Sequence, residues 1–316
     1  MQAFLVRRSL QLQLDGLISP AMDEGQNIIM VDGLAYAYPG APTPTVEDIS
    51  FTVRRGTIFG LLGPSGAGKS TVQRILTRQI RRIDRGKVDV LGKDILHWDH
   101  TLFEKVGVGF ELPNHYPRLT ALENLKFFAS FYRSATADPV DLLRRVGLAE
   151  AATKRVSEFS KGMQVRLNFA RALIHDPELL FLDEPTTGLD PTTAKLIRAE
   201  ISGLRAAGKT IILTTHNMHD AETLCDEVGF IARGRMRTID TPQALKLKYG
   251  SHTVRVTLTS DSRSEDRVFP MKGLGGNKEF LDTIRNGSLQ TIHSQEASLD
   301  QVFQDVTGET LTAEGG

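Results

Sequence analysis

The sequence has a single cysteine, no long hydrophobic run and no excess of charge of either sign. Because Cys225 is alone among 316 residues, no internal disulfide is possible, and a reducing compartment is favoured. The 38 basic and 38 acidic residues cancel, which removes the electrostatic case for a nucleic-acid partner. The longest apolar runs, such as 179–182, have the length of strands and are too short to cross a bilayer. A role at a membrane therefore requires a partner chain.

A glycine-rich segment follows one of these short apolar runs. It consists of Gly63, Pro64, Ser65, Gly66, Ala67, Gly68, Lys69, Ser70 and Thr71, which fit the phosphate-loop pattern G-x-x-x-x-G-K-[ST]. The apolar stretch 57–62 predicts a buried strand before the loop, and the spacing of apolar residues in 70–77 predicts a helix after it. Strand, loop and helix N-terminus together form an anion site from backbone N–H groups and the helix dipole. The segment predicts nucleotide binding, with Lys69 at the β- and γ-phosphates and the Ser70 hydroxyl on Mg²⁺.

Two acidic residues end a later apolar strand. Asp183 and Glu184 follow four apolar residues, and the carboxyl ends of strands are where α/β sheets place ligands. Opposite Ser70, Asp183 is expected to hold Mg²⁺ and Glu184 to polarise an attacking water. His216 also ends an apolar strand, 210–215, so we expect it at the same edge, although a lone histidine is more often structural.

The pattern of strand and helix signals predicts how the chain is organised. Residues 1–27 carry little pattern and are expected to form a mobile leader. Residues 28–245 predict an α/β domain of the phosphate-loop NTPase class, with a mostly parallel sheet core. Two antiparallel strands, 28–38 and 45–53, are expected at its start, and a helical subdomain at about 115–175. Residues 251–310 predict a small C-terminal α+β extension.

Within the helical stretch, a capping box at Thr120 and Glu123 predicts a helix to residue 132. Residues 138–146 predict a second helix and 154–159 part of a third. Outside it, Tyr38 stands just before a Pro-Gly turn, where its ring can stack on a purine. A half-buried strand tyrosine is an equally good interpretation of its local sequence, and both stay open.

A further segment gives the chain a family resemblance over roughly residues 28–240. Phe159-Ser160-Lys161-Gly162-Met163 resembles the signature motif of the ATP-binding subunits of ABC transporters. In the same order as in that family, 63–71 resembles the Walker A motif and 179–184 the Walker B motif with its catalytic glutamate. Residues 187–190 resemble the D-loop, His216 the switch histidine and Tyr38 the adenine-stacking aromatic.

The resemblance implies how the protein works. Two such domains, expected to be a homodimer, pair head to tail, and each ATP lies between Lys69 and Ser70 of one copy and Ser160 and Gly162 of the other. Glu184 is expected to act as base, His216 to contact the γ-phosphate and Asp190 to work across the interface. Closure of the pair drives transmembrane permease subunits, which places the chain at the cytoplasmic face of the membrane as a peripheral subunit.

Two departures from the family pattern refine the expectation. Lys161 and Met163 replace a glycine and a glutamine of the usual signature, and this form resembles the ABC-2 exporter subgroup, as does the C-terminal segment 297–308. Glu111 stands where the Q-loop glutamine is usual. A carboxylate there can still ligate Mg²⁺, but it adds repulsion against the γ-phosphate. A tolerated variant and a slower or differently coupled ATPase are the two interpretations.

Taken together, these features predict an ATP-hydrolysing subunit of an ABC exporter that needs ATP and Mg²⁺. Two alternatives stand beside it: an ABC-type ATPase without a transport role, and a regulatory subunit that binds ATP but hydrolyses it weakly. The transported substrate is not encoded in these motifs, so drug, lipid and polysaccharide stay open, with multidrug efflux among them.

Overall fold

The structure is a computed structural model that describes residues 26–110, 114–134, 136–250, 253–260, 263–295 and 297–309. Most of the expected leader, up to residue 25, lies outside the described residues, and so does Glu111. Within the described part, no helix has the combined length and hydrophobicity that a bilayer crossing requires.

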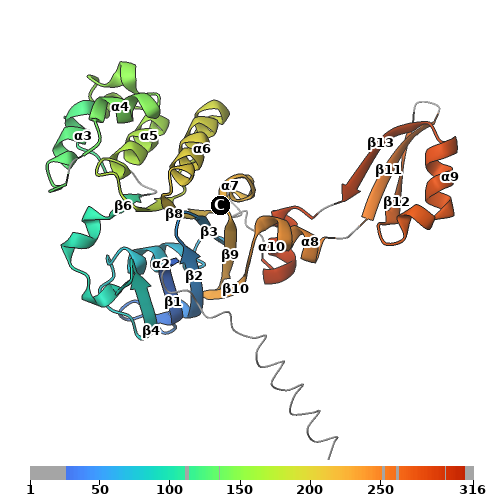
Figure 1. The fold of residues 1–316 in the computed structure, drawn as a ribbon, viewed down its shortest axis with the longest axis horizontal. Coiled ribbons are helices and arrows are strands. Elements are labelled where there is room, and N and C mark those ends of the chain that lie inside the picture. The colour runs from blue at the N-terminus through green and yellow to red at the C-terminus, as the bar shows by residue number, and fades with distance from the viewer. Residues whose placement is uncertain are drawn as a thin grey trace, which may run out of the picture.

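A six-stranded sheet forms the centre of the main body (Figure 1). Its order is β10-β9-β3-β8-β7-β6; all neighbours are parallel except β10, which runs antiparallel to β9. The parallel strands are short and apolar because both faces of the sheet are covered. The strands are β3 (Ile58–Leu62), β6 (Val106–Gly109), β7 (Leu179–Asp183), β8 (Thr210–Thr215), β9 (Glu227–Ala232) and β10 (Arg235–Asp240).

Alternate side chains of these strands supply two hydrophobic cores. On β7, Leu179 and Phe181 point into one core, and Leu180 and Leu182 into the other. This alternation is the period of two that a strand imposes on its side chains. A one-residue slip would exchange the two cores, so the register of β7 is firmly specified.

The first core lies between the central sheet and a four-stranded antiparallel sheet of order β2-β1-β4-β5. The rings of Phe51 and Phe59 stack across this core, 5.1 Å apart. Helix α2 (Lys69–Leu76) contributes Val72, Ile75 and Leu76 to it. The strands are β1 (Asn27–Tyr36), β2 (Val46–Arg54), β4 (Arg85–Val90) and β5 (Lys93–Asp94).

Helices cover the other face of the central sheet. The helical subdomain contains α3 (Ala121–Ala129), α4 (Pro139–Arg145) and α5 (Lys161–Ala172), and α3 begins at the expected capping box. The helix expected over 154–159 is wrong: only a 3₁₀ turn, Val156–Glu158, forms there. The reason is that Phe159 and Ser160 are extended, since Ser160 is the N-cap of α5. Beside these helices lie α6 (Pro191–Ala206) and α7 (Met218–Leu224).

The C-terminal segment forms a small lobe and then returns to the main body. The lobe has a three-stranded sheet of order β12-β11-β13 and helix α9 (Lys278–Asn286), and Figure 1 shows it set apart from the rest. Its strands are β11 (Thr253–Ser260), β12 (Arg263–Pro270) and β13 (Leu289–Gln295).

The lobe is attached between α8 (Pro242–Tyr249) and α10 (Leu299–Thr307), which pack on each other. The chain leaves the main body after Gly250 and returns at Ala297, and these points adjoin: a Cβ on Gly250 would lie 3.4 Å from the Ala297 nitrogen. Helix α10 then buries Phe303 against Phe230 of β9, with ring centroids 5.1 Å apart. The last helix is therefore part of the main core.

Candidate functional site

The glycine loop runs from β3 into α2, as the sequence predicts. At two positions of the loop only glycine fits, because neighbouring atoms leave no room for a Cβ. A Cβ on Gly63 would lie 2.2 Å from the Ile231 carbonyl oxygen, and one on Gly68 would lie 2.8 Å from Val46. Gly68 also has a φ of 109°, in the region that favours glycine. Because Gly68 is the N-cap of α2, the loop ends at the positive pole of a helix.

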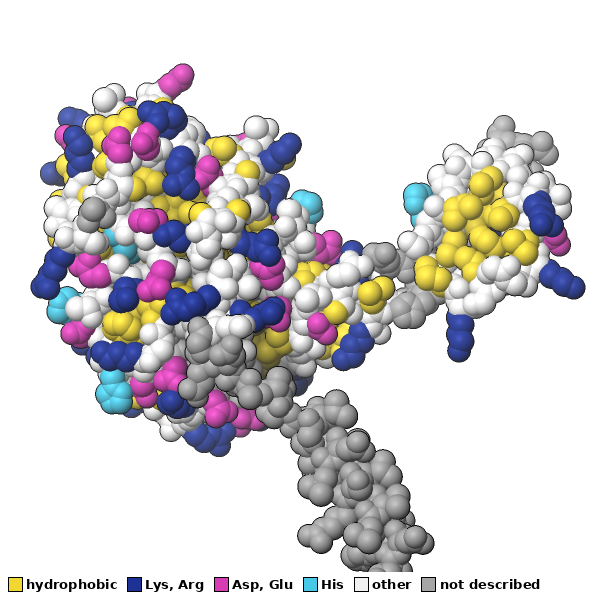
Figure 2. Space-filling view, in the orientation of Figure 1, with side chains coloured by type: hydrophobic (Ala, Val, Ile, Leu, Met, Phe, Trp, Pro, Cys, Tyr) yellow, Lys and Arg dark blue, Asp and Glu magenta, His cyan; other side chains and the backbone are white. Residues whose placement is uncertain are grey.

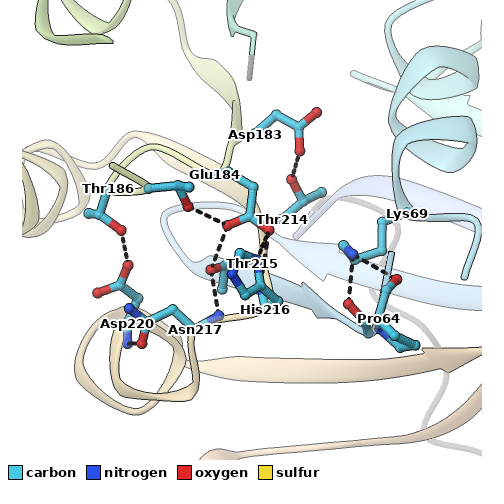
Figure 3. Close-up of polar contacts among 12 residues, drawn as sticks. Pro64, Lys69, Asp183, Glu184, Thr186, Thr214, Thr215, His216, Asn217 and Asp220 are labelled. Atoms are coloured by element: carbon cyan, nitrogen blue, oxygen red, sulfur yellow. Dashed lines mark hydrogen bonds and ion pairs between the residues drawn. The ribbon is translucent and has the colours of Figure 1, made fainter. Parts of the chain in front are cut away.

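Lys69 lies in this loop with its side chain folded back on it. Its Nζ donates to the Gly63 carbonyl oxygen at 2.6 Å and to the Pro64 carbonyl oxygen at 3.1 Å (Figure 3). The side chain is nearly buried, so these bonds compensate part of its desolvation. The ammonium group is thus fixed beside the loop's backbone, where a phosphate would bind.

A cavity of about 310 Å³ joins this loop to the two acidic residues and to the histidine. These residues come together because β8 pairs in parallel with both β3 and β7, so the carboxyl ends of the three strands lie at one edge of the sheet. The expected residues at this cavity are Ser65, Gly66, Gly68, Lys69, Ser70, Thr71, Asp183, Glu184 and His216, with Thr45 and Thr187 in addition.

Asp183 and Glu184 are oriented by the next strand. Asp183 pairs in register with Thr214 of β8, and the Thr214 hydroxyl donates to its carboxylate. At Glu184 the backbone turns out of the strand with a φ of 49°, a left-handed conformation that costs about 1–3 kcal/mol for a non-glycine residue. That turn directs the carboxylate of Glu184 towards His216.

Four donors converge on the Glu184 carboxylate (Figure 3). Oε1 accepts from the His216 backbone N–H at 3.0 Å and lies 2.8 Å from His216 Nδ1. Oε2 accepts from the hydroxyls of Thr187 at 2.9 Å and Thr215 at 3.2 Å. The Glu184 side chain is 8% exposed and that of His216 50%, so the carboxylate is enclosed while the imidazole reaches solvent.

A buried ion pair between Arg198 and Asp220 lies next to the segments that follow Glu184 and His216. Asp220 of α7 is fully buried and accepts from Arg198 of α6 at 2.8 Å and from the Thr186 hydroxyl. Thr186 lies two residues beyond Glu184, and Asn217 caps α7 directly after His216. The pair therefore ties the segments that follow Glu184 and His216 to each other.

The signature residues do not line this cavity. Ser160 accepts from the Met163 N–H at 3.3 Å as the N-cap of α5, and Asp190 caps α6 by accepting from Thr193 N at 3.0 Å. The hydrogen bonds from Thr193 hold the pKa of Asp190 below its ordinary value. Gly162 lies beside Leu189: a Cβ added to Gly162 would be 3.4 Å from the Cδ2 of Leu189. The signature therefore adjoins the D-loop at Leu189, and neither Ser160 nor Gly162 is among the residues that line the cavity at the glycine loop of the same chain.

Tyr38 lies next to the start of α2. Its hydroxyl is 3.4 Å from Thr71 Oγ1, and Arg74 donates to it at 3.3 Å. Its ring meets Tyr36 edge to face, with centroids 5.1 Å apart. The structure therefore brings Tyr38 to the border of the phosphate loop.

The segments on both sides of Glu111 are held by the signature helix. Asn168 donates to the Phe110 carbonyl oxygen at 2.7 Å, and Arg171 donates to the Asn114 carbonyl oxygen at 2.5 Å. His115 Nε2 lies 3.0 Å from the Gln164 carbonyl oxygen, and burial lowers the pKa of His115 to about 4. Phe103, Phe110, Tyr116 and Phe128 line a second cavity there. These contacts place Phe110 and Asn114 at this aromatic cavity.

Sequence reasoning missed Thr45, Thr214 and Thr215 as residues at or behind the site. Thr214 and Thr215 end an apolar strand immediately before His216, and two polar residues there were the available signal. Thr187 was noticed only as part of the D-loop resemblance and not as a donor to Glu184.

Comparisons with known proteins agree with this geometry. Residues 46–187 match the ABC transporter family, and residues 252–296 match the fluoroquinolone efflux ABC transporter C-terminal domain. The chain is 52% identical over 289 residues to a fluoroquinolones export ATP-binding protein of Mycobacterium tuberculosis, covering 91% of this chain and 96% of the relative. It is 33% identical to the linearmycin resistance ATP-binding protein of Bacillus subtilis, covering 84% and 94% respectively.

Solved structures have the same fold. A dimeric ATP-binding cassette bound to ADP and Pi superposes with a TM-score of 0.62 at 24% identity, covering 67% of this chain and 98% of that one. The ATP-binding subunit of an ABC transporter gives a TM-score of 0.64 at 27% identity, covering 70% and 93%. The expected phosphate-loop fold is confirmed.

Proposed function

This chain belongs to the ATP-binding subunits of ABC transporters, and on that premise we propose that it powers the export of fluoroquinolone-type drugs through separate membrane-spanning subunits. The observation that carries the substrate class is the 52% identity, over 91% of the chain, to a protein named for fluoroquinolone export. The match of residues 252–296 to a C-terminal domain named for the same efflux supports it. The expectation of an ATP-hydrolysing exporter subunit is confirmed by its relatives, which are named for export or drug resistance.

The glycine loop binds the phosphates of ATP. Backbone N–H groups of the loop and the N-terminus of α2 donate to the phosphate oxygens. Lys69 exchanges its bonds to the Gly63 and Pro64 carbonyls for β- and γ-phosphate oxygens. At the border of the loop, Tyr38 stacks on the adenine.

Glu184 is the general base. It takes a proton from the attacking water at Oε1 while the water oxygen bonds to the γ-phosphorus. The bond from that phosphorus to the β–γ bridging oxygen breaks, and ADP leaves with the bond's electron pair. His216 contacts the γ-phosphate and steadies it. Thr187 and Thr215 hold the carboxylate in place throughout, since they donate to its other oxygen.

The donor set at the loop fits Mg²⁺. The hydroxyl of Ser70 and the carboxylate of Asp183 line the same cavity, and Mg²⁺ prefers one or two protein oxygens together with phosphate oxygens and water. When bound there, the ion neutralises charge on the β- and γ-phosphates. Glu111 is a candidate further ligand of the ion. Its two interpretations stay open: a tolerated variant, or a residue that makes the ATPase slower or differently coupled.

The partner completes the ATP site. Ser160 and Gly162 are not among the residues that line the ATP cavity of their own chain, and in this proposal they face the γ-phosphate held by a second copy. The N-cap of α5 then presents backbone N–H groups to that phosphate, and Asp190 works across the interface. The pair sits at the cytoplasmic face of the membrane, docked on transmembrane permease subunits.

Drug accumulation in cells tests the proposal. Cells that produce the assembled exporter should retain less fluoroquinolone, measured by its fluorescence, than cells with the Glu184→Gln variant. Glu178→Gln, which changes a half-buried glutamate just before β7, is the matched control and should export normally. Equal accumulation in all three, with normal ATP hydrolysis by the wild type, would refute the substrate class. If the wild-type protein hydrolysed no ATP, the ATPase role would be refuted.

A further inference from the structure

The two edges of the small lobe's sheet differ in charge. In the order β12-β11-β13, the outer strands are β12 and β13. Strand β12 carries Glu265, Asp266 and Arg267, and charges of this kind protect an edge from pairing with another chain. Strand β13 contains no Asp, Glu, Lys or Arg. Among the described residues, no strand pairs with its outer edge, so its backbone groups there are a template for another strand.

Strand β13 also extends the lobe's apolar face beyond its helix. By register, Ile292 lies opposite Val256 and Leu289 opposite Leu258, so these side chains share the face that α9 covers. Val256 is fully buried on that face, whereas Ile292 is 43% and Leu289 46% exposed. Figure 2 shows hydrophobic side chains gathered on one face of this lobe, bordered by Lys and Arg. The apolar layer is therefore incomplete at the β13 edge.

We propose that β13 pairs antiparallel with β13 of a second copy of this chain. A two-fold axis beside the strand would join two three-stranded sheets into one of six strands, with the Ile292 side chains of both copies in a common apolar layer. The occupant is a second copy because an uncharged strand meets itself without like-charge repulsion. A strand such as β12 would instead bring charges against Ile292.

The size of the contact defines its role. A register shift between Thr257 and Leu258 of β11 limits the regular edge of β13 to the stretch from Thr291 onwards. Such a short edge buries less than the about 800 Å² per partner of a stable interface. The contact therefore adds to the pairing at the ATP sites by raising the effective concentration of one copy near the other. It goes beyond the proposed function, because it needs no nucleotide.

Cross-linking of the full chain tests the pairing. Ile292→Cys should be joined to a second copy by a short bis-maleimide without nucleotide, and faster with ATP in the Glu184→Gln background. Val268→Cys is the control: it is 51% exposed on β12, far from the proposed axis, and should react much more slowly. The native Cys225 does not interfere, because it is buried and burial raises the pKa of its thiol. Equal cross-linking rates at both positions overturn the proposal.

Charge reversal tests the two-fold symmetry. Donor and acceptor dyes on Lys272→Cys report proximity of two lobes by energy transfer. Ile292→Lys and Ile292→Glu should each abolish the transfer, whereas a mixture of the two variants should restore it. Transfer that survives both substitutions, or that is lost in both and does not return on mixing, overturns the proposal. ATP hydrolysis by each variant, measured alongside, distinguishes misfolding from loss of the contact.

Discussion

Nδ1 of His216 lies 2.8 Å from Oε1 of Glu184, and the backbone N–H of the same histidine donates to that oxygen at 3.0 Å. A carboxylate only accepts, so the proton of this contact belongs to Nδ1. With Thr187 and Thr215 on Oε2, all of the roughly four acceptor positions of the carboxylate are filled. A water that gives its proton to Glu184 must displace one of these donors. The imidazole is the natural one to leave, because it is half exposed, whereas Thr215 is fully buried.

Replacing the base should separate ATP binding from hydrolysis. The Glu184→Gln variant keeps the size of the side chain but removes its proton affinity, so hydrolysis should fall about 10²–10⁴-fold. ATP affinity should stay within a few-fold, because the phosphate loop is untouched. Phosphate release and equilibrium binding of a fluorescent ATP analogue measure the two. Glu178→Gln should retain full turnover, and normal turnover by Glu184→Gln would remove the role of base from this residue.

Removing the two hydroxyls on Oε2 should lower turnover without weakening ATP binding. Thr187→Val and Thr215→Val each delete a hydrogen bond to a charged group, worth about 1.5–3 kcal/mol. We expect kcat to fall roughly tenfold to a hundredfold at unchanged KM. Thr223→Val removes a hydroxyl that bonds only within α7 and is the matched control. A rise in KM with unchanged kcat would show that the hydroxyls do not position the base.

Mixing two inactive variants should recover activity if each ATP site is shared between copies. Lys69→Ala damages the phosphate loop and Ser160→Arg the signature, so each variant alone should be inactive. Random mixing places one intact site in half of the pairs, and about a quarter of wild-type turnover should return. Steady-state hydrolysis of the equimolar mixture gives the answer. If each chain completed its own site, the mixture would stay inactive.

The buried Arg198–Asp220 ion pair should contribute more to the free energy of unfolding than an exposed ion pair does. Arg198→Met leaves the fully buried Asp220 carboxylate without its cation, which costs about 3–5 kcal/mol. The Arg205–Asp226 pair is more exposed, so Arg205→Met should cost about 1 kcal/mol or less. Urea unfolding of both variants makes the comparison. Equal losses of stability would mean that Asp220 is solvated or paired elsewhere.

Acid should destabilise the protein partly through His175. Burial lowers the pKa of His175 to about 4, and its ring stacks on Tyr132 at 4.0 Å. Between its ordinary pKa of 6.5 and about 4, the unfolded chain binds a proton that the folded chain does not, so stability falls as the pH falls through this window. His175→Gln should lose less stability than the wild type between pH 7 and pH 4, followed by thermal melting. The exposed His97→Gln variant should follow the wild-type pH profile.

Much of the site could be predicted because its residues stand at strand ends. Glu184 and His216 follow apolar strands, and neighbouring parallel strands deliver them to one edge. The hydroxyls of Thr187 and Thr215 could not be assigned, because their bonds depend on the turn at Glu184 rather than on spacing. Strand β12 was missed since its charged sequence resembles a loop; it forms by pairing residue for residue with β11. Residues 156–158 form a 3₁₀ turn where the sequence predicts helix, because capping of α5 at Ser160 outweighs local helix propensity.

The adjoining positions of Gly250 and Ala297 make the small lobe a detachable insert. Helix α10 follows the lobe in sequence but seals Phe230 in the main core, so a chain cut short at residue 250 would lose that cover. A chain in which Gly250 is joined by a few residues to Ala297 would keep it. The lobe can therefore be removed, or exchanged between relatives, without exposing the hydrophobic core of the main body to solvent.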